Sequence, residues 1–160
     1  KGNWNYGTTT HNDIPVKTGT RYYKMNAGNI TKSLSPGKYK LEYWAKGTAI
    51  TLTGGTITTI RTSGADANGW ILYEKEINVT STVTFQMSGA STAHIDELRI
   101  YPVNARMTSY TYDPVNGMTS ITDPNNFIAY YEYDDFGRLK HIKDKDGNIV
   151  KSQEYHYKAN

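Results

Sequence analysis

The stretch Tyr131-Glu132-Tyr133-Asp134 repeats an earlier stretch, Tyr110-Thr111-Tyr112-Asp113, at an offset of 21 residues. The same offset relates Met118 to Leu139, so the repeat continues into the segment that follows each tyrosine pair. Units this short are supersecondary elements that stack on their neighbours, and such stacks usually form scaffolds or surfaces. The repeat therefore predicts an array of β-hairpins and favours architecture and binding over an active site.

Turn-forming residues separate the predicted strands of this region. Aspartate begins each turn, and its side chain closes such turns by accepting backbone N–H groups. We therefore interpret the repeated aspartates as turn formers and predict a β-hairpin meander over residues 110–160. The four turns are Asp113-Pro114-Val115-Asn116-Gly117, Asp123-Pro124-Asn125-Asn126, Asp134-Asp135-Phe136-Gly137 and Asp144-Lys145-Asp146-Gly147-Asn148.

Tyrosine occupies fixed places in the meander, and we expect these rings to form stacked ladders across the hairpins. A third pair, in Tyr155-His156-Tyr157, follows the second after 24 residues, so the last unit is atypical, as terminal repeats often are. The tyrosines concerned are Tyr110, Tyr112, Tyr131, Tyr133, Tyr155 and Tyr157.

Residues 1–102 read as many short strands separated by turn residues. Leu41 and Tyr43 alternate with Glu42 and Trp44, and the segment 83–87 alternates in the same way. Period-two alternation with frequent turns predicts an antiparallel β-sandwich, and no amphipathic helix is evident. The predicted fold is therefore all-β: a sandwich over 1–102, a connector over 103–109 and hairpins over 110–160.

The last predicted strand of the sandwich breaks the alternation. Leu98 and Ile100 share a parity, but Ile95 falls on the opposite one. One extra residue near Asp96 and Glu97, a β-bulge, would bring all three apolar side chains onto the core face. The alternative is that Ile95 fills a second apolar surface.

Composition limits the classes of function. The chain has 160 residues, a net charge of +3 and no cysteine, and its basic residues are dispersed. Dispersed charge is typical of a solvated surface, so we expect no nucleic-acid partner. The lack of cysteine excludes disulfides and thiolate chemistry. No apolar run approaches the length of a transmembrane helix, so we expect no membrane insertion.

The segment from Tyr131 to Leu139, with Asp144 to Asn148 after it, resembles the YD repeat of RHS-repeat proteins. The shared pattern is Tyr-Asp, then Gly-Arg-Leu, then Asp-x-x-Gly, and it covers about 48 residues here. The resemblance implies a β-hairpin strip, and in large family members many such strips wind into a shell or spiral. Two and a half copies cannot enclose anything alone.

The N-terminal region resembles a galactose-binding-like jelly roll, the fold of many carbohydrate-binding modules. The matching segments are 17–23, 34–46 and 95–101. A sandwich of this kind followed by YD repeats resembles the C-terminal end of large proteins of Bacteroidetes-type bacteria. The resemblance implies a secreted or bacterial cell-surface location and a polysaccharide or surface glycan as partner.

Four aromatic side chains are candidates for sugar contact. Alternation from Tyr43 places Trp44 on the outer face, where a flat ring among polar groups suits a sugar. The alternatives are that the YD hairpins or a neighbouring strip cover Trp44, or that it faces inward. Trp70 follows a loop and is either a plug at the end of the sandwich or a ring at a binding site. Tyr22 and Tyr23 are adjacent, so one of them is expected to face outward.

Asp96 is the candidate metal ligand. The resemblance to carbohydrate-binding jelly rolls suggests a structural Ca²⁺ there, since hard oxygen ligands suit that ion. The alternative is a hydrogen-bonded residue at the strand edge. We expect no other cofactor and no catalytic residue, because the histidines lack zinc-ligand spacing and no nucleophile motif is present. The chain is not expected to be an enzyme.

Two hypotheses of function follow. The first is a non-catalytic module for carbohydrate binding and adhesion, within a large secreted or cell-surface protein. The second is a structural subunit that self-assembles as a filament, or as the cap of a shell or spiral, because open strand edges are templates for further strands. Its partners would be the rest of a larger polypeptide or copies of itself.

Overall fold

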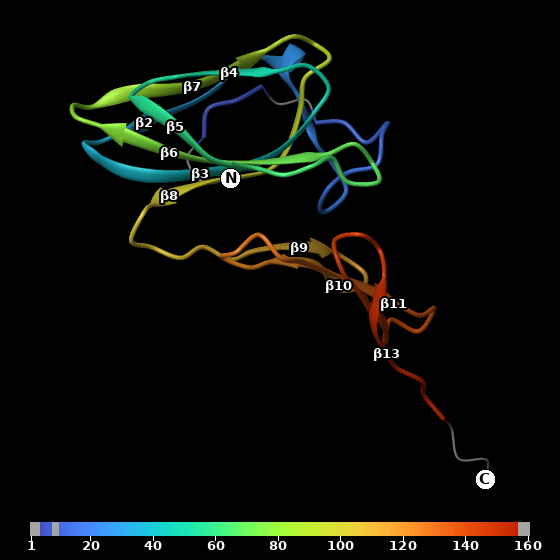
Figure 1. Ribbon diagram of the computed structural model, residues 1–160. Coiled ribbons are helices and arrows are strands. Elements are labelled where there is room, and N and C mark those ends of the chain that lie inside the picture. Colours follow the sequence, from blue (N-terminus) through green and yellow to red (C-terminus); the bar gives the residue numbers. More distant parts are fainter. Residues whose placement is uncertain (1–3, 8–9, 157–160) are drawn as a thin grey trace. The chain divides into compact units, whose positions relative to one another are not determined.

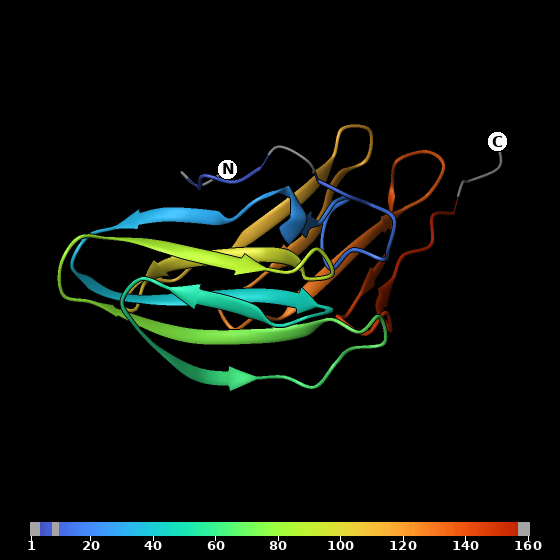
Figure 2. The same ribbon diagram turned by 90° about the horizontal axis from the view of Figure 1, so that it is seen from above.

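The computed structural model describes residues 4–7 and 10–156 and is shown in Figures 1 and 2. The chain divides into two compact units, Lys1–Arg106 and Met107–Asn160, here called the sandwich unit and the hairpin unit. The regular structure is antiparallel β throughout apart from one 3-10 turn, which confirms the predicted all-β class. Among the described residues, no helix has the length and apolar character needed to cross a membrane.

Two sheets form the sandwich unit, facing each other across a common core (Figures 1 and 2). One has five strands in the order β1-β8-β3-β6-β5, and the other has three in the order β2-β7-β4. The elements are β1 Tyr23–Lys24, η1 Met25–Ala27, β2 Ile30–Leu34, β3 Gly37–Lys46, β4 Ile50–Thr53, β5 Thr56–Thr62, β6 Ile71–Val79, β7 Val83–Gly89 and β8 His94–Pro102.

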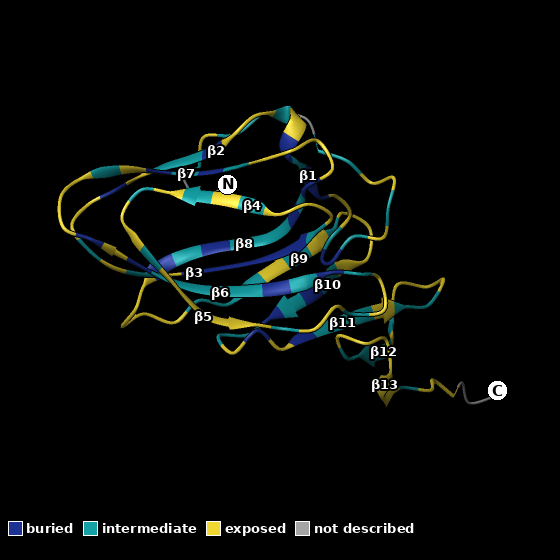
Figure 3. Ribbon diagram, turned by 45° about the horizontal axis from the view of Figure 1, so that its top comes forward, coloured by how far each residue is buried: buried dark blue, intermediate teal, exposed yellow. Residues whose placement is uncertain are grey.

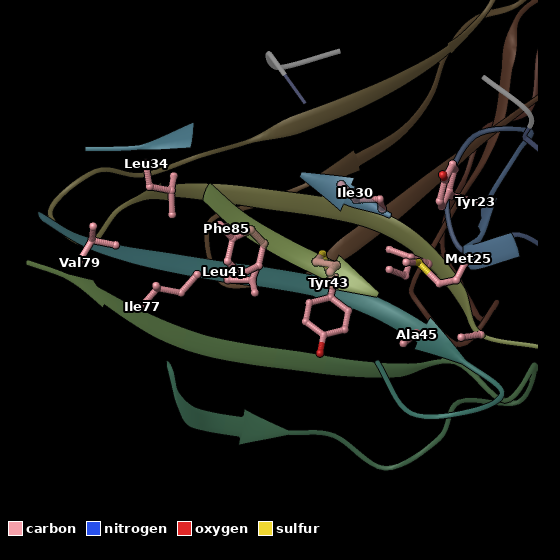
Figure 4. Close-up of a cluster of buried hydrophobic side chains, with 13 residues drawn as sticks. Tyr23, Met25, Ile30, Leu34, Leu41, Tyr43, Ala45, Ile77, Val79 and Phe85 are labelled. Atoms are coloured by element: carbon pink, nitrogen blue, oxygen red, sulfur yellow. The ribbon is translucent and has the colours of Figure 1, made fainter. Parts of the chain in front are cut away.

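Alternating side chains of β3 and β7 fill the core between the sheets (Figure 4). Leu41 and Tyr43 of β3 are at most 2% exposed, and Phe85 and Met87 of β7 are fully buried. Each strand of this kind buries every second side chain and turns the others outward. The period-two pattern of the sequence thus specifies the inner face of the sandwich directly.

A β-bulge interrupts the pairing of β3 with β8. Glu42 lies opposite Arg99 and Trp44 opposite Asp96, so β8 carries one residue more than β3 in this interval. Glu97 takes a positive φ of 49° at the bulge. The predicted bulge is confirmed, and its alternative is wrong. The apolar side chains that the bulge brings to the core are Ile95, Leu98 and Ile100.

The hairpin unit is a single five-stranded antiparallel meander in the order β13-β12-β11-β10-β9. Each strand pairs with its neighbours in sequence, so β9 and β13 lie at the two edges. Along β13 every residue is exposed (Figure 3). The strands are β9 Ser109–Asp113, β10 Gly117–Thr122, β11 Ile128–Tyr133, β12 Leu139–Lys143 and β13 Ile149–Ser152.

One turn geometry recurs in the chain. At Asp134, the Oδ1 atom accepts the N–H groups of Phe136 and Arg138 at 2.9 Å each. The Asp134 N–H donates to the carbonyl of Arg138, and the Gly137 N–H donates to that of Asp134. The interpretation of the repeated aspartates as turn formers is confirmed. The same bonds recur at Asp66, Asp123 and Asp144.

The fourth residue of this turn requires a left-handed backbone. Gly137 and Gly147 supply it with φ of 72° and 87°, and Asn126 takes the same place with φ of 64°. Asparagine tolerates this region better than other residues that carry a Cβ. The turn at 123–127 therefore keeps its shape although the first repeat lacks the glycine.

Candidate functional site

The four predicted sugar platforms are all buried. Tyr22 is 2% exposed, Tyr23 7%, Trp44 3% and Trp70 0%. A ring can stack on a sugar only if one of its faces is open to solvent. The prediction that these rings form a surface platform is therefore wrong.

The cause is a segment without regular structure, residues 12–20, here called the covering segment. Alternation does place Trp44 on the face of β3 away from the core, but the Lys17 Nζ atom lies 4.0 Å from the centroid of its ring. Trp70 donates from Nε1 to the carbonyl of Pro15 at 2.9 Å. The chain thus covers both tryptophans. For Trp44 this agrees with the alternative that a neighbouring strip covers the ring, and the inward alternative is wrong.

Tyr22 and Tyr23 point to opposite sides of the sheet, as adjacent strand residues must. Tyr23 belongs to the core, and its hydroxyl donates to the Gly28 carbonyl at 2.8 Å. Tyr22 packs edge-on against Trp70 with ring centroids 6.1 Å apart and donates to Asp13. Both phenols therefore hold the fold together.

A buried ion pair fixes the covering segment. The Lys17 ammonium lies 2.8 Å from Asp66 Oδ2, and their side chains are 2% and 8% exposed. Burial works to raise the pKa of Asp66, but the Lys17 ammonium and the N–H groups of Trp70 and Asn68 hold it below its usual value. Burying two charges is tolerated when each has its partner and further hydrogen bonds, as here.

Asp96 holds the same segment through its backbone. Its Oδ2 atom accepts the N–H groups of Lys17 and Thr18 at 2.8 and 3.1 Å, and its Oδ1 accepts that of Glu97 at 2.7 Å. Burial raises the pKa of Asp96 to about 6 although these three bonds act in the opposite direction. This arrangement corresponds to the hydrogen-bonded alternative to a calcium ligand. Within the described residues, no group of three or more His, Cys, Asp or Glu side chains could hold a metal ion.

A row of charges crosses the outer face of the larger sheet. Glu42 of β3 lies directly opposite Glu74 of β6, and like charges at this spacing repel. Arg61 binds Glu74 with two bonds of 2.9 and 2.6 Å, and Arg99 lies 2.9 Å from Glu42, which also accepts the Tyr101 hydroxyl. Both carboxylates thus accept hydrogen bonds from an arginine or a tyrosine. We therefore interpret Glu42 and Glu74 as parts of a network that stabilises the sheet.

Exposed apolar side chains concentrate in the hairpin unit, although it is the smaller unit. In the described part of the sandwich unit, the exposed large hydrophobic side chains are Ile60 and Val103. Contiguous exposed apolar groups mark interaction surfaces, so such a surface is more expected in this unit than in the sandwich unit. In the hairpin unit they are Tyr110, Tyr112, Val115, Phe127, Phe136, Ile149, Val150 and Tyr155.

The tyrosines of the hairpin unit face aliphatic side chains across the strands. Tyr112 lies opposite Met118, and Tyr133 lies opposite Leu139, so the 21-residue offset reproduces the same pair. The Tyr133 hydroxyl donates to the Met118 carbonyl at 2.7 Å, and the Tyr155 hydroxyl donates to the Leu139 carbonyl at 3.0 Å. The ladders of the described strands therefore pair tyrosine with aliphatic residues, and the expectation of tyrosine rings stacked across the hairpins is wrong.

Tyr155 therefore takes the place of Tyr133 in the last unit, one residue later than the strict repeat would give. The Arg138 guanidinium lies 4.4 Å from the centroid of the Tyr155 ring and holds it against the hairpin. Tyr157, the last of the predicted ladder, lies outside the described residues.

The two edge strands of the hairpin unit differ in how they are protected. Edge strands expose unpaired N–H and C=O groups, and charged side chains, especially lysine, or short length discourage pairing. β13 has four residues and carries Lys151. β9 has five residues and one charge, Asp113, whose carboxylate accepts the N–H groups of Val115 and Asn116 in its own turn.

The outward edge of β9, residues 109–113, is therefore the best candidate for a functional surface; we call it the β9 edge. Tyr110 and Tyr112 are 50% and 65% exposed on one face of this strand. The sequence predicted a hairpin meander with open edges for assembly and placed the sugar site in the sandwich unit. The structure adds that two exposed tyrosines lie beside one of these edges.

No protein-family model matches the chain, and a search of curated proteins finds no match either.

Proposed function

We propose that the chain is a non-catalytic structural module, which joins further β-hairpins through the open edges of its hairpin unit. The observation that carries this proposal is the β9 edge, which has no neighbouring strand within the described residues and has Tyr110 and Tyr112 exposed beside it. An edge strand extends a sheet by main-chain hydrogen bonds, and exposed side chains on alternate positions select the partner.

The partners are hairpins of the same kind, either in the rest of a larger polypeptide or in copies of this chain. The resemblance to YD repeats supports this assignment, because those repeats stack into long strips. It also supports a place in a large secreted or cell-surface protein. A sheet also becomes more stable by gaining strands.

Sedimentation velocity tests the proposal at chain concentrations up to about 1 mM, the effective concentration that a short tether supplies. We expect the wild type to self-associate and a variant with lysine on both edges, Tyr112→Lys with Val150→Lys, to remain monomeric. Val115→Lys is the matched control, because Val115 is 88% exposed in the β9–β10 turn and belongs to neither edge strand. A wild type that stays monomeric at every concentration would refute the proposal.

One observation favours a second function, binding of a neutral polysaccharide by the sandwich unit. The outward positions of the three-stranded sheet carry hydroxyl and amide groups and no charge. Such groups both donate and accept hydrogen bonds, as the hydroxyls of a sugar do. These residues are Thr31 and Ser33 of β2, Thr84, Gln86 and Ser88 of β7, and Thr51 and Thr53 of β4.

Affinity electrophoresis in gels that contain soluble neutral polysaccharides tests this second function. Gln86 is the central residue, because it lies opposite both Thr31 and Thr53. We expect Gln86→Glu to abolish retardation by placing a charge in the middle of the face. Thr58→Glu, which adds the same charge on exposed β5, should leave it intact. Equal migration of the wild type with and without every polysaccharide would exclude the second function.

A further inference from the structure

The β9 edge has an internal symmetry. Its central residues, Tyr110-Thr111-Tyr112, read the same in both directions, and Thr111 is the middle residue of the strand. A strand that pairs with its own copy in antiparallel fashion does so around a two-fold axis, and the axis relates the same surface in both copies. Palindromic strands therefore place like side chains opposite one another.

The register of such a pair is restricted. Directly opposed residues lie on the same face of a sheet, so Tyr110 and Tyr112 of one copy can oppose only residues of the same parity in the other. An axis at Thr111 satisfies this condition and also pairs all five residues of the strand. No other allowed register gives complete overlap.

We infer that β9 pairs with β9 of a second copy of this chain around a two-fold axis at Thr111. The inference rests on the proposed function and names the partner of its edge. Tyr110 of each copy then lies opposite Tyr112 of the other copy, so the interface contains two such tyrosine pairs. Cross-strand aromatic pairs are among the favourable ones in antiparallel sheets.

Strand direction disfavours the alternative of head-to-tail stacking. Successive strands from β9 to β13 are all antiparallel, so β9 and β13 run in the same direction. A translated copy would place its β9 beside β13 as a parallel pair, and parallel pairing is less stable per residue. Lys151 further discourages pairing at β13.

The longer edge strand of the sandwich unit is also protected, unlike β9. β5 carries Arg61 and a register shift between Thr59 and Arg61. A bulge of this kind twists an edge away from partners. β9 has no bulge of its own, because the irregularity in its pairing lies on β10 between Met118 and Ser120. Its one charged residue, Asp113, accepts hydrogen bonds within its own turn.

Single cysteines test the register, because the chain contains no cysteine of its own. Facing Cα atoms of antiparallel strands are about 4.5–5.5 Å apart, which lies within the range that a disulfide spans. Thr111→Cys therefore opposes itself across the axis. In the same register Ser109 lies about 14 Å from Ser109 of the second copy, too far for a disulfide.

Under mild oxidation we expect Thr111→Cys to give a cross-linked dimer on a non-reducing gel and Ser109→Cys to give none. A wild type that self-associates, combined with a Thr111→Cys variant that does not cross-link, would overturn this inference and leave the proposed hairpin pairing intact. A wild type that is monomeric at all concentrations would overturn both. Equal cross-linking by the two variants would overturn the register.

A second pair of variants keeps the test valid if Thr111→Cys fails to fold, since the Thr111 hydroxyl is bonded to Ser120. Tyr110→Cys and Tyr112→Cys change exposed side chains. In the inferred register the two proteins should cross-link to each other when mixed, because position 110 opposes position 112. Each protein alone should remain uncross-linked, and mixing without a cross-link would overturn the inference.

Discussion

The protonation of Asp96 offers a direct test of how the covering segment is held. Three backbone N–H groups donate to this carboxylate and favour its charged form, whereas burial favours its neutral form. Burial is the stronger effect, and it raises the pKa from a usual value of 3.8 to about 6. The replacement Asp96→Asn removes the titration and nearly preserves the shape of the side chain.

The sign of the pH effect follows from the raised pKa. Between the two pKa values the folded state binds a proton that the unfolded state has lost, so stability falls as the pH rises. The contribution of Asp96 is complete below pH 3.8 and is lost above about pH 6. A tenfold change in the acid dissociation constant corresponds to about 1.4 kcal/mol, so the loss of stability reaches up to about 3 kcal/mol.

Urea unfolding of the wild type and of Asp96→Asn, from about pH 4 to about pH 7, measures this change as the difference between their free energies of unfolding. Groups common to both proteins cancel in that difference. We expect the advantage of the wild type to shrink as the pH rises. A constant difference would show that the pKa of Asp96 is unshifted, and a growing one would show that the hydrogen bonds outweigh burial; either result refutes the reasoning.

Two further predictions use matched substitutions, both read from unfolding midpoints. Trp70→Phe should destabilise the chain by about 0.5–1.5 kcal/mol more than Trp44→Phe, because it removes the hydrogen bond from Nε1 to the Pro15 carbonyl. The Trp44 Nε1 atom, by contrast, is buried without a partner in the described part of the chain. Gly137→Ala should cost about 1–2 kcal/mol for its left-handed backbone alone. Gly54→Ala should cost clearly more, since a Cβ there would lie 2.7 Å from the backbone of β7, whereas at Gly137 nothing lies within 4 Å. Equal costs within either pair would contradict the contacts described.

Local pattern was enough to predict the features that depend on neighbouring residues. The bulge in β8 followed from the parity of Ile95 against Leu98, because alternation is a property of a few consecutive residues. The turn at Asp134 followed for the same reason, since its bonds close within four residues. Such features are present in the sequence before any tertiary contact forms.

The burial of the tryptophans could not be predicted in this way. The covering segment has no periodicity, and its path depends on bonds between distant residues: Lys17 to Asp66, separated by 49 positions, and Pro15 to Trp70, separated by 55. Alternation correctly gave the face of Trp44 but not what lies over it. An outward aromatic residue in a sequence therefore identifies a face of a sheet, and only the fold decides whether that face is open.

Pairing through the β9 edge is weak by its own energetics. Two tyrosine pairs contribute about 0.2–1 kcal/mol each, and the strand adds main-chain bonds of about 0.5–1.5 kcal/mol each. Association of two free molecules costs about 4–15 kcal/mol in lost translation and rotation, which offsets most of that gain. Tethering removes much of this cost, because copies fixed on one surface or in one polypeptide meet at effective concentrations of about 1 mM. An edge of this strength would remain unpaired in dilute solution and close when copies are crowded together, so it suits a module of a larger surface protein better than a freely diffusing dimer.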